Sequence, residues 1–204
     1  MAITAQQVKE LRDATGAGPL DCKNALQQFE GDMTRAADFL REKGLAKAAK
    51  KAGRATNDGI IHVYLHHNNR LGVMIELNCE TDFVAKTDIF RTLANDIALQ
   101  IANLAPEYVR REDIPQSVVD AERDLQRRRA LDEGKPEAVV DKIVDGRMAK
   151  FYEELALVEQ PFIKDDSVTI GEMITRAIAE LGENITLSRF ARFEVGQSSA
   201  ADEA

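Results

Sequence analysis

Residues 78–87 read Asn-Cys-Glu-Thr-Asp-Phe-Val-Ala-Lys-Thr, and at this point an apolar strand ends and a helix begins. A corner of this kind is a rigid mount for the side chains on it. The pattern alone leaves two interpretations open. In one, Thr81 or Asp82 caps the helix while Phe83 fills the core beneath it. In the other, Phe83 projects beside the Asp82 carboxylate as a hydrophobic wedge, a shape that suits prying groups apart and does not suit catalysis.

The segment before the corner predicts an antiparallel β-hairpin that turns at residues 67–70. Apolar residues alternate in its first strand with aromatic and basic ones, at Ile61, Val63 and Leu65 against His62, Tyr64 and His66. The return strand is expected to bury one face, made of Val73, Ile75, Leu77 and Cys79. A helix over residues 88–104 is expected to cover the sheet through Ile89, Leu93, Ile97 and Ile101.

Residues 1–44 predict a module of three short helices. Thr4 and Gln7 form a capping box at the first helix, Gly16 and Pro19 separate the first helix from the second, and Asp32 caps the third. Three helices of this length enclose only a thin core, and a domain that small usually binds something. A basic, alanine-rich linker follows over residues 45–58.

Residues 116–160 predict two charged helices joined by Gly134-Lys135-Pro136, and hence an antiparallel coiled-coil arm. The apolar seam of its second helix is Val139, Val140, Ile143, Val144 and Met148. A helix over 169–181 and a strand over 185–195 then complete the fold. The predicted class is α+β: an antiparallel β-sheet with helices on one face, a core formed by residues 59–115 and 161–195, an inserted helical arm, and a disordered tail at 196–204.

The charge distribution limits the kinds of partner. The net charge of −8 argues against nonspecific binding of nucleic acid, which needs clustered Lys and Arg. Residues 1–55 carry ten Lys and Arg against seven Asp and Glu, a net of +3, so the remainder carries −11. No apolar run approaches the length of about 20 residues that a membrane span needs. We therefore expect a cytoplasmic protein without a nucleic-acid or membrane partner.

Several residues invite a chemical interpretation, and each also has a plain structural one. His62 and His66 would share a strand face as a metal pair, but no third ligand is placed nearby, and a solvent face beside a turn is a natural place for histidines. Cys22 precedes Lys23, whose charge would lower the pKa of the thiol, yet a small buried thiol is the simpler interpretation. Residues 127–129 are all arginine, but acidic neighbours dilute their charge. No nucleotide-binding glycine loop or hydrolase elbow occurs, and we expect no metal and no cofactor.

Three separated stretches resemble the elongation factor Ts family. Residues 8–12, 15–18 and 21–26, Val-Lys-Glu-Leu-Arg, Thr-Gly-Ala-Gly and Asp-Cys-Lys-Asn-Ala-Leu, are similar to its ubiquitin-associated-like N-terminal module. Residues 78–86 resemble its core signature. Its arm and closing strand are matched by Gly134-Lys135-Pro136, Gly146-Arg147-Met148, Gln160-Pro161-Phe162 and Arg192-Phe193-Glu194-Val195-Gly196. The resemblance covers nearly the whole chain in the right order.

The resemblance implies a guanine nucleotide exchange factor for elongation factor Tu in translation, with no covalent chemistry of its own. In the family, the pair matched by Asp82 and Phe83 enters the partner near its magnesium and phosphate site. The neighbouring positions Thr81, Val84 and Lys86 belong to the same signature. The N-terminal module also docks on the partner in the family, which implies contacts through Arg12, Pro19, Leu20 and Lys23. Many members have two methionines where this chain has Pro19 and Leu20.

The chain resembles the short form of the family, because one hairpin and helix precede the arm and one strand follows it. The resemblance implies a homodimer, in which two chains supply two cores. We expect contact at sheet edges near Tyr108 or along the last strand, since an unpaired edge needs covering. Two other functions remain open from the residues: a module that binds a peptide or a ubiquitin-like surface, and a thiol enzyme using Cys22.

Overall fold

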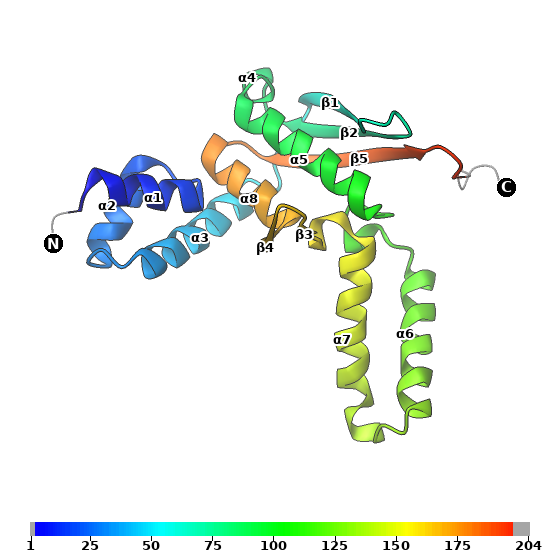
Figure 1. The fold of residues 1–204 in the computed structure, drawn as a ribbon. Helices are drawn as coiled ribbons and strands as arrows, with labels where there is room; N and C mark the ends of the chain where they lie inside the picture. Colours follow the sequence, from blue (N-terminus) through cyan, green and yellow to red (C-terminus); the bar gives the residue numbers. More distant parts are fainter. Residues whose placement is uncertain (1–2, 198–204) are drawn as a thin grey trace. The chain divides into compact units, whose positions relative to one another are not determined.

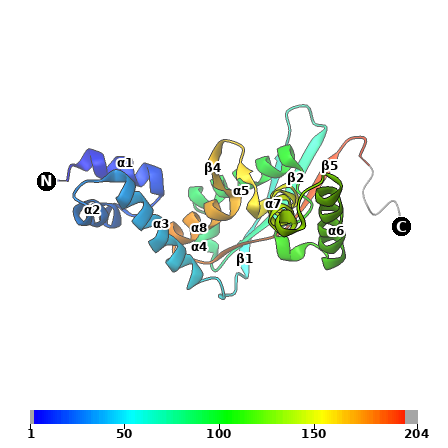
Figure 2. The same ribbon diagram turned by 90° about the horizontal axis from the view of Figure 1, so that it is seen from below.

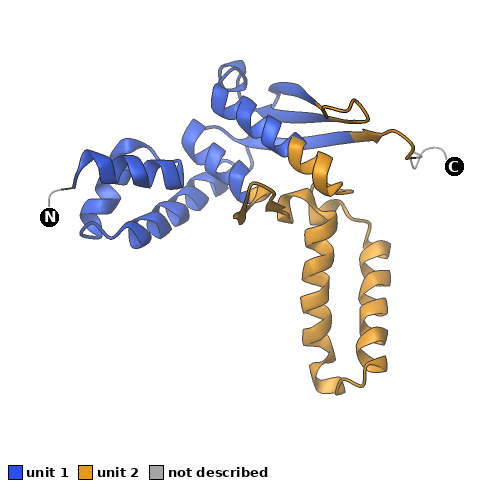
Figure 3. Ribbon diagram, in the orientation of Figure 1, with its two compact units in different colours: residues 1–64, 74–98, 172–191 blue, residues 65–73, 99–171, 192–204 orange. Residues whose placement is uncertain are grey.

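The structure is a computed structural model of the chain, and it describes residues 3–197. It divides into two compact units that are interleaved along the sequence (Figure 3). Unit 1 comprises residues 1–64, 74–98 and 172–191, and unit 2 comprises residues 65–73, 99–171 and 192–204. The expected mixture of helices and an antiparallel sheet is confirmed, so the fold class is α+β.

The α-helices are α1 (Ala5–Thr15), α2 (Pro19–Gln28), α3 (Met33–Ala49), α4 (Asp82–Ala85), α5 (Asp88–Leu104), α6 (Gln116–Asp132), α7 (Glu137–Leu155) and α8 (Ile170–Leu181). The strands are β1 (Asp58–Leu65), β2 (Leu71–Cys79), β3 (Pro161–Phe162), β4 (Asp165–Thr169) and β5 (Ile185–Glu194). Short 3₁₀ helices lie at η1 (Arg111–Asp113) and η2 (Leu157–Glu159).

Helices α1 to α3 form the predicted three-helix bundle at the start of unit 1 (Figure 1). Thr4 caps α1 with the full capping box to Gln7, and the Asp32 side chain accepts a hydrogen bond from the Arg35 amide at the start of α3. Gly16 ends α1 with a φ of 67°, which a residue with a side chain rarely adopts. The core of the bundle is small and fully enclosed: Leu11, Cys22, Ala25, Leu26, Ala36 and Leu40. Helix α3 continues to Ala49, so the predicted linker begins as helix.

The larger sheet has the strand order β1-β2-β5, and α5 lies across it (Figure 1). Strand β2 buries the predicted face of Val73, Ile75, Leu77 and Cys79. The alternation in β1 left open which of its two faces is covered. Ile61, Val63 and Leu65 are each more than half exposed, whereas His62 and Tyr64 are half-buried. Strict alternation indicates that the strand has two different faces, but it does not show which of them packs against the core.

The buried stripe of α5 is also shifted from the prediction at its first turn. Ile89 is exposed, and Phe90 takes the buried place that was expected for it. Leu93, Ile97 and Ile101 are buried as predicted. The stripe widens through the small residues Ala94, Ala98 and Ala102, which bring the helix close to the structure that it covers.

The arm of unit 2 is the helical pair α6 and α7, which run side by side in both views (Figures 1 and 2). Gly134, with a φ of 74°, forms the turn between them. Val140, Val144 and Met148 fill the seam, but Val139 is exposed, so that part of the predicted seam is wrong. Ion pairs cross the exposed sides of the arm: Arg123 to Asp145, Arg127 to Asp141 and Arg147 to Glu133.

A small hairpin of β3 and β4 follows the arm and was not predicted. Its strands are short, and the sequence of β4, Asp-Asp-Ser-Val-Thr, has no apolar alternation. The buried side chain of Gln100 holds the hairpin, because its amide nitrogen donates to the Pro161 carbonyl at 3.0 Å and its amide oxygen accepts from the Ile163 amide at 3.0 Å.

Two expectations concern the chain as a whole. None of the helices within residues 3–197 is apolar for long enough to cross a membrane. Most of the tail predicted to be disordered, residues 198–204, lies outside the described residues.

Candidate functional site

Strand β2 ends at Cys79, and the chain turns at once into α4, a single helical turn. Val84 and Ala85 lie on the buried side of this turn, with exposed fractions of 8% and 4%. The same geometry directs Phe83 outward, where 79% of its surface is exposed. The interpretation that puts Phe83 in the core is therefore wrong, and the projecting interpretation describes the corner.

Asp82 and Lys86 form an ion pair one turn apart on the same corner. The hydrogen bond from the Lys86 ammonium to the Asp82 carboxylate raises the pKa of that lysine. The pair places a negative and a positive group beside the exposed ring. Because both side chains are largely exposed, the pair contributes little to stability, and its charges remain accessible to a partner.

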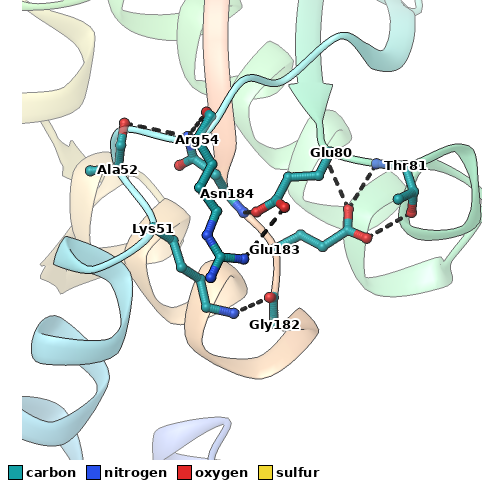
Figure 4. A network of polar contacts seen from close by, with 8 residues as sticks. All are labelled: Lys51, Ala52, Arg54, Glu80, Thr81, Gly182, Glu183 and Asn184. Atoms are coloured by element: carbon teal, nitrogen blue, oxygen red, sulfur yellow. Dashed lines mark hydrogen bonds and ion pairs between the residues drawn. The ribbon is translucent and has the colours of Figure 1, made fainter.

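The corner is not held by helix capping at Thr81, contrary to the sequence interpretation. Thr81 makes no capping hydrogen bond; its hydroxyl instead donates to Oε1 of Glu183 at 2.7 Å. The backbone amides of Glu80 and Thr81 donate to Oε2 of Glu183 at 3.1 and 3.0 Å (Figure 4). The capping role falls to Thr87, whose hydroxyl oxygen accepts from the Phe90 amide in the first turn of α5.

A second carboxylate makes the reverse connection. Oε1 of Glu80 accepts from the backbone amide of Asn184 at 2.7 Å, and this hydrogen bond is the main reason why the pKa of Glu80 is lowered. Glu80 also meets Arg54 at 3.5 Å. The turn after β2 and the turn between α8 and β5 therefore bind each other through a pair of carboxylates, each directed at the backbone of the opposite turn (Figure 4).

The basic segment after α3 is fastened to the same pair of turns. The Asn184 side chain, in a residue that is 2% exposed, donates to the Arg54 carbonyl at 2.8 Å. Lys51 donates to the carbonyl of Gly182. Sequence reasoning treated this segment as a linker and missed Glu183 and Asn184 altogether. About a hundred residues separate Glu183 from the amides that it binds, and a single sequence carries no signal that pairs them.

The other candidate contacts lie on the surface of the three-helix bundle. Arg12, Pro19, Leu20 and Lys23 are all exposed. Leu20 is 70% exposed at the start of α2, where nothing within the bundle requires a large apolar side chain. The first turn of α2 therefore presents an exposed apolar side chain.

The geometry does not favour chemistry at the cysteines or histidines. Cys22 is fully buried, as the simpler interpretation predicted, and burial raises the pKa of its thiol, so the alternative of activation by Lys23 is wrong. Burial likewise raises the pKa of Cys79 to about 11. Within the part of the chain that the structure describes, no group of three or more His, Cys, Asp or Glu side chains is arranged to hold a metal ion.

Comparison with known proteins identifies the family. A family model described as elongation factor TS matches residues 3–197. The chain is 56% identical over 201 residues to elongation factor Ts of Carboxydothermus hydrogenoformans, in a match that covers 98% of this chain and 93% of that protein. Elongation factor Ts of Heliobacterium modesticaldum is 54% identical, with 97% and 92% covered. That of Solibacter usitatus is 52% identical, with 98% and 94% covered.

These relatives are of similar length to this chain, because each match spans more than nine-tenths of both proteins. The agreement extends through the bundle, the corner, the arm and the closing strand. The chain therefore belongs to the elongation factor Ts family.

Proposed function

We propose that this chain is a guanine nucleotide exchange factor that binds elongation factor Tu in the cytoplasm and promotes release of GDP during translation elongation. The observation that carries the proposal is the corner at residues 79–86. A phenylalanine that is 79% exposed stands on a single helical turn, beside an exposed ion pair, in a chain of the elongation factor Ts family.

The proposed mechanism is insertion of Phe83 and Asp82 next to the magnesium and phosphate site of the partner. Magnesium bridges the nucleotide phosphates to the protein that binds them, so displacing the groups that hold it weakens the nucleotide. Asp82 brings a negative charge towards a site that already holds phosphate. No bond is made or broken in this mechanism, and no cofactor takes part.

Thermodynamic linkage sets the energy that the wedge must supply. If the exchange factor binds nucleotide-free partner more tightly than GDP-bound partner, it lowers the affinity for GDP by the same factor. A thousandfold reduction requires about 4 kcal/mol of differential contact. One aromatic residue buried in a complex contributes about 2 kcal/mol or more as a hot spot, and displaced charge contacts add to it.

The surface proposed for the partner has two parts. At the corner it consists of Thr81, Asp82, Phe83 and Lys86, with Val84 holding the turn from the buried side. On the bundle it consists of Arg12, Pro19, Leu20 and Lys23, with the exposed Leu20 as its apolar centre. Charged groups at the rim of such a surface speed association, and the apolar groups set how long the complex lasts.

We also propose that the chain works as a homodimer. Strands β1 and β5 are the outer strands of the sheet, and both present large apolar side chains to solvent, among them Val63 and Phe193. Exposed apolar residues on an unpaired edge favour association with another sheet. Tyr108, the other expected contact, pairs with Ala156 in an isolated parallel bridge.

The function is tested by the release of fluorescent GDP from elongation factor Tu. The partner is preloaded and mixed with excess unlabelled GDP, with and without this protein at micromolar concentration. We expect acceleration that increases with the concentration of this protein and then saturates. An unchanged release rate over that range would rule out the exchange function and leave a simple binding module as the remaining interpretation.

A further inference from the structure

The Glu183 carboxylate makes three hydrogen bonds to the turn that carries Phe83, and it belongs to a different part of the chain. Oε2 accepts from the amides of Glu80 and Thr81, and Oε1 accepts from the Thr81 hydroxyl. Hydrogen bonds to an ionised acceptor are stronger than those between neutral groups. One side chain thus satisfies two consecutive backbone amides and the hydroxyl next to them.

Helix α4 cannot fix the direction of Phe83 by itself. It has only four residues, and a single helical turn is unstable in isolation, because nucleation costs more conformational entropy than one turn recovers. The ring of Phe83 is mostly exposed, so packing does not hold it. Its direction therefore depends on the backbone at residues 80 and 81, which is where Glu183 binds.

Glu183 is itself held on the side away from the wedge. Its neighbour Asn184, which is 2% exposed, donates its side-chain amide to the Arg54 carbonyl at 2.8 Å. Its other neighbour, Gly182, has a φ of 82° and accepts a hydrogen bond from Lys51 through its carbonyl. Both neighbours of Glu183 in the chain are thus held by hydrogen bonds, which fixes the backbone from which its carboxylate extends to residues 80 and 81 (Figure 4).

We propose that Glu183 is a positioning residue for nucleotide exchange: it holds the turn of Phe83 in the inserting direction before the partner arrives. The inference rests on the exchange function proposed above. A group that is already oriented loses less conformational entropy on binding, so the same contacts give tighter association. Glu183 itself acts only through Phe83.

A double-mutant cycle separates positioning from general support of the fold. Glu183→Ala is expected to lower the stimulated rate of GDP release about tenfold, the size of a coupling between residues that act together. In a Phe83→Ala background, the same substitution is expected to change the rate less than about twofold, because the group that it positions is gone. An equal loss in both backgrounds, or no loss with Phe83 present, would overturn the proposal.

Two further variants control for shape and charge. Glu183→Gln keeps an acceptor for the amides, and its amide group still reaches the Thr81 hydroxyl, so it is expected to restore most of the rate. Glu180→Ala removes one exposed carboxylate from α8 without touching the turn, and the rate is expected to stay unchanged. If Glu183→Ala does not fold, Glu183→Asp, which shortens the side chain by one methylene, takes its place in the cycle.

Amide hydrogen exchange in the isolated protein separates failure of this inference from failure of the exchange function. Glu183→Ala is expected to speed exchange at the amides of Glu80 and Thr81 at least tenfold, and Glu180→Ala is expected to leave them unchanged. Unchanged protection in Glu183→Ala would overturn the positioning role even if exchange on the partner is real. In a second outcome, wild-type protein does not accelerate GDP release, but Glu183→Ala still speeds hydrogen exchange at the two amides. The nucleotide-exchange function is then wrong, while the role of Glu183 in fixing the turn is supported.

Discussion

The Phe83 ring is 79% exposed in the free protein. Contact between this apolar surface and water is unfavourable for the free energy of the folded state. The surrounding residues do not compensate for this by packing against it. They fix the backbone instead, through Val84 below and Glu183 beside the turn. An exposed Phe83 on a fixed turn adds little to the stability of its own fold, and it is well placed to contact another protein.

Glu80 gives a prediction for acid stability. Its pKa lies below the ordinary value of 4.5 in the folded protein, mainly because its carboxylate accepts the Asn184 amide. Unfolding therefore takes up a proton at this residue, and the stability that Glu80 contributes, present above the unfolded pKa, is lost as the pH falls through the lowered folded value.

We expect the free energy of unfolding to fall less steeply below pH 4.5 in Glu80→Gln than in wild-type protein. Urea unfolding at a series of pH values from neutral to acidic measures the two slopes. Asp21 and Glu76, whose pKa values are also lowered, titrate in both proteins, so the difference reports Glu80 alone. Identical slopes would show that the bond to Asn184 does not depend on the charge.

At the scale of helices and strands, periodicity was informative wherever one face of an element is buried and the other is wet. It located α5, α7 and β2 and most of their buried residues. It failed for β1, where both sets of alternating residues are large and partly apolar, so nothing in the pattern distinguishes the covered face. It also failed for β3 and β4, which are held by Gln100 and not by an apolar face.

The candidate site was predictable only in part for the same reason. Asp82 and Phe83 are adjacent in sequence, so the corner was recognisable as a corner. The hold on it depends on Glu183 and Asn184, which approach through the fold and leave no local pattern. The sequence offered Thr81 as a helix cap, because a threonine hydroxyl often bonds to backbone amides nearby in the chain. In the structure this hydroxyl bonds instead to the carboxylate of Glu183, which is distant in sequence.

In the arm of α6 and α7, we expect a substitution in the buried seam to lower stability much more than one on the exposed sides. Met148 is 1% exposed in the seam, so Met148→Ala is expected to destabilise the arm by about 2–5 kcal/mol through lost burial and a cavity. Asp145→Ala breaks only the exposed pair with Arg123, which is worth less than about 1 kcal/mol. Amide hydrogen exchange along α7 measures both. Equal losses would show that ion pairs and not the apolar seam hold the two helices together.

At the scale of the whole molecule, the proposed dimer is the simplest property to measure. One chain has a mass of 22.6 kDa, and sedimentation at micromolar concentration is expected to give twice that value. Phe193 is exposed on the outer strand β5, and Phe193→Glu is expected to reduce the mass to that of one chain, because a charge cannot be buried there without a partner. Wild-type protein that sediments as a single chain would contradict the dimer.

We have proposed that Phe83 is the group that releases the nucleotide. The most direct test is the rate of GDP release from elongation factor Tu at saturating concentrations of Phe83→Ala. The matched control is Leu104→Ala, which removes another exposed apolar side chain outside the proposed contact surface. We expect the stimulated rate to fall about 30-fold with Phe83→Ala, as the loss of about 2 kcal/mol at a hot spot implies, and to stay unchanged with Leu104→Ala. A Phe83→Ala protein that folds and releases GDP at the wild-type rate would contradict the account.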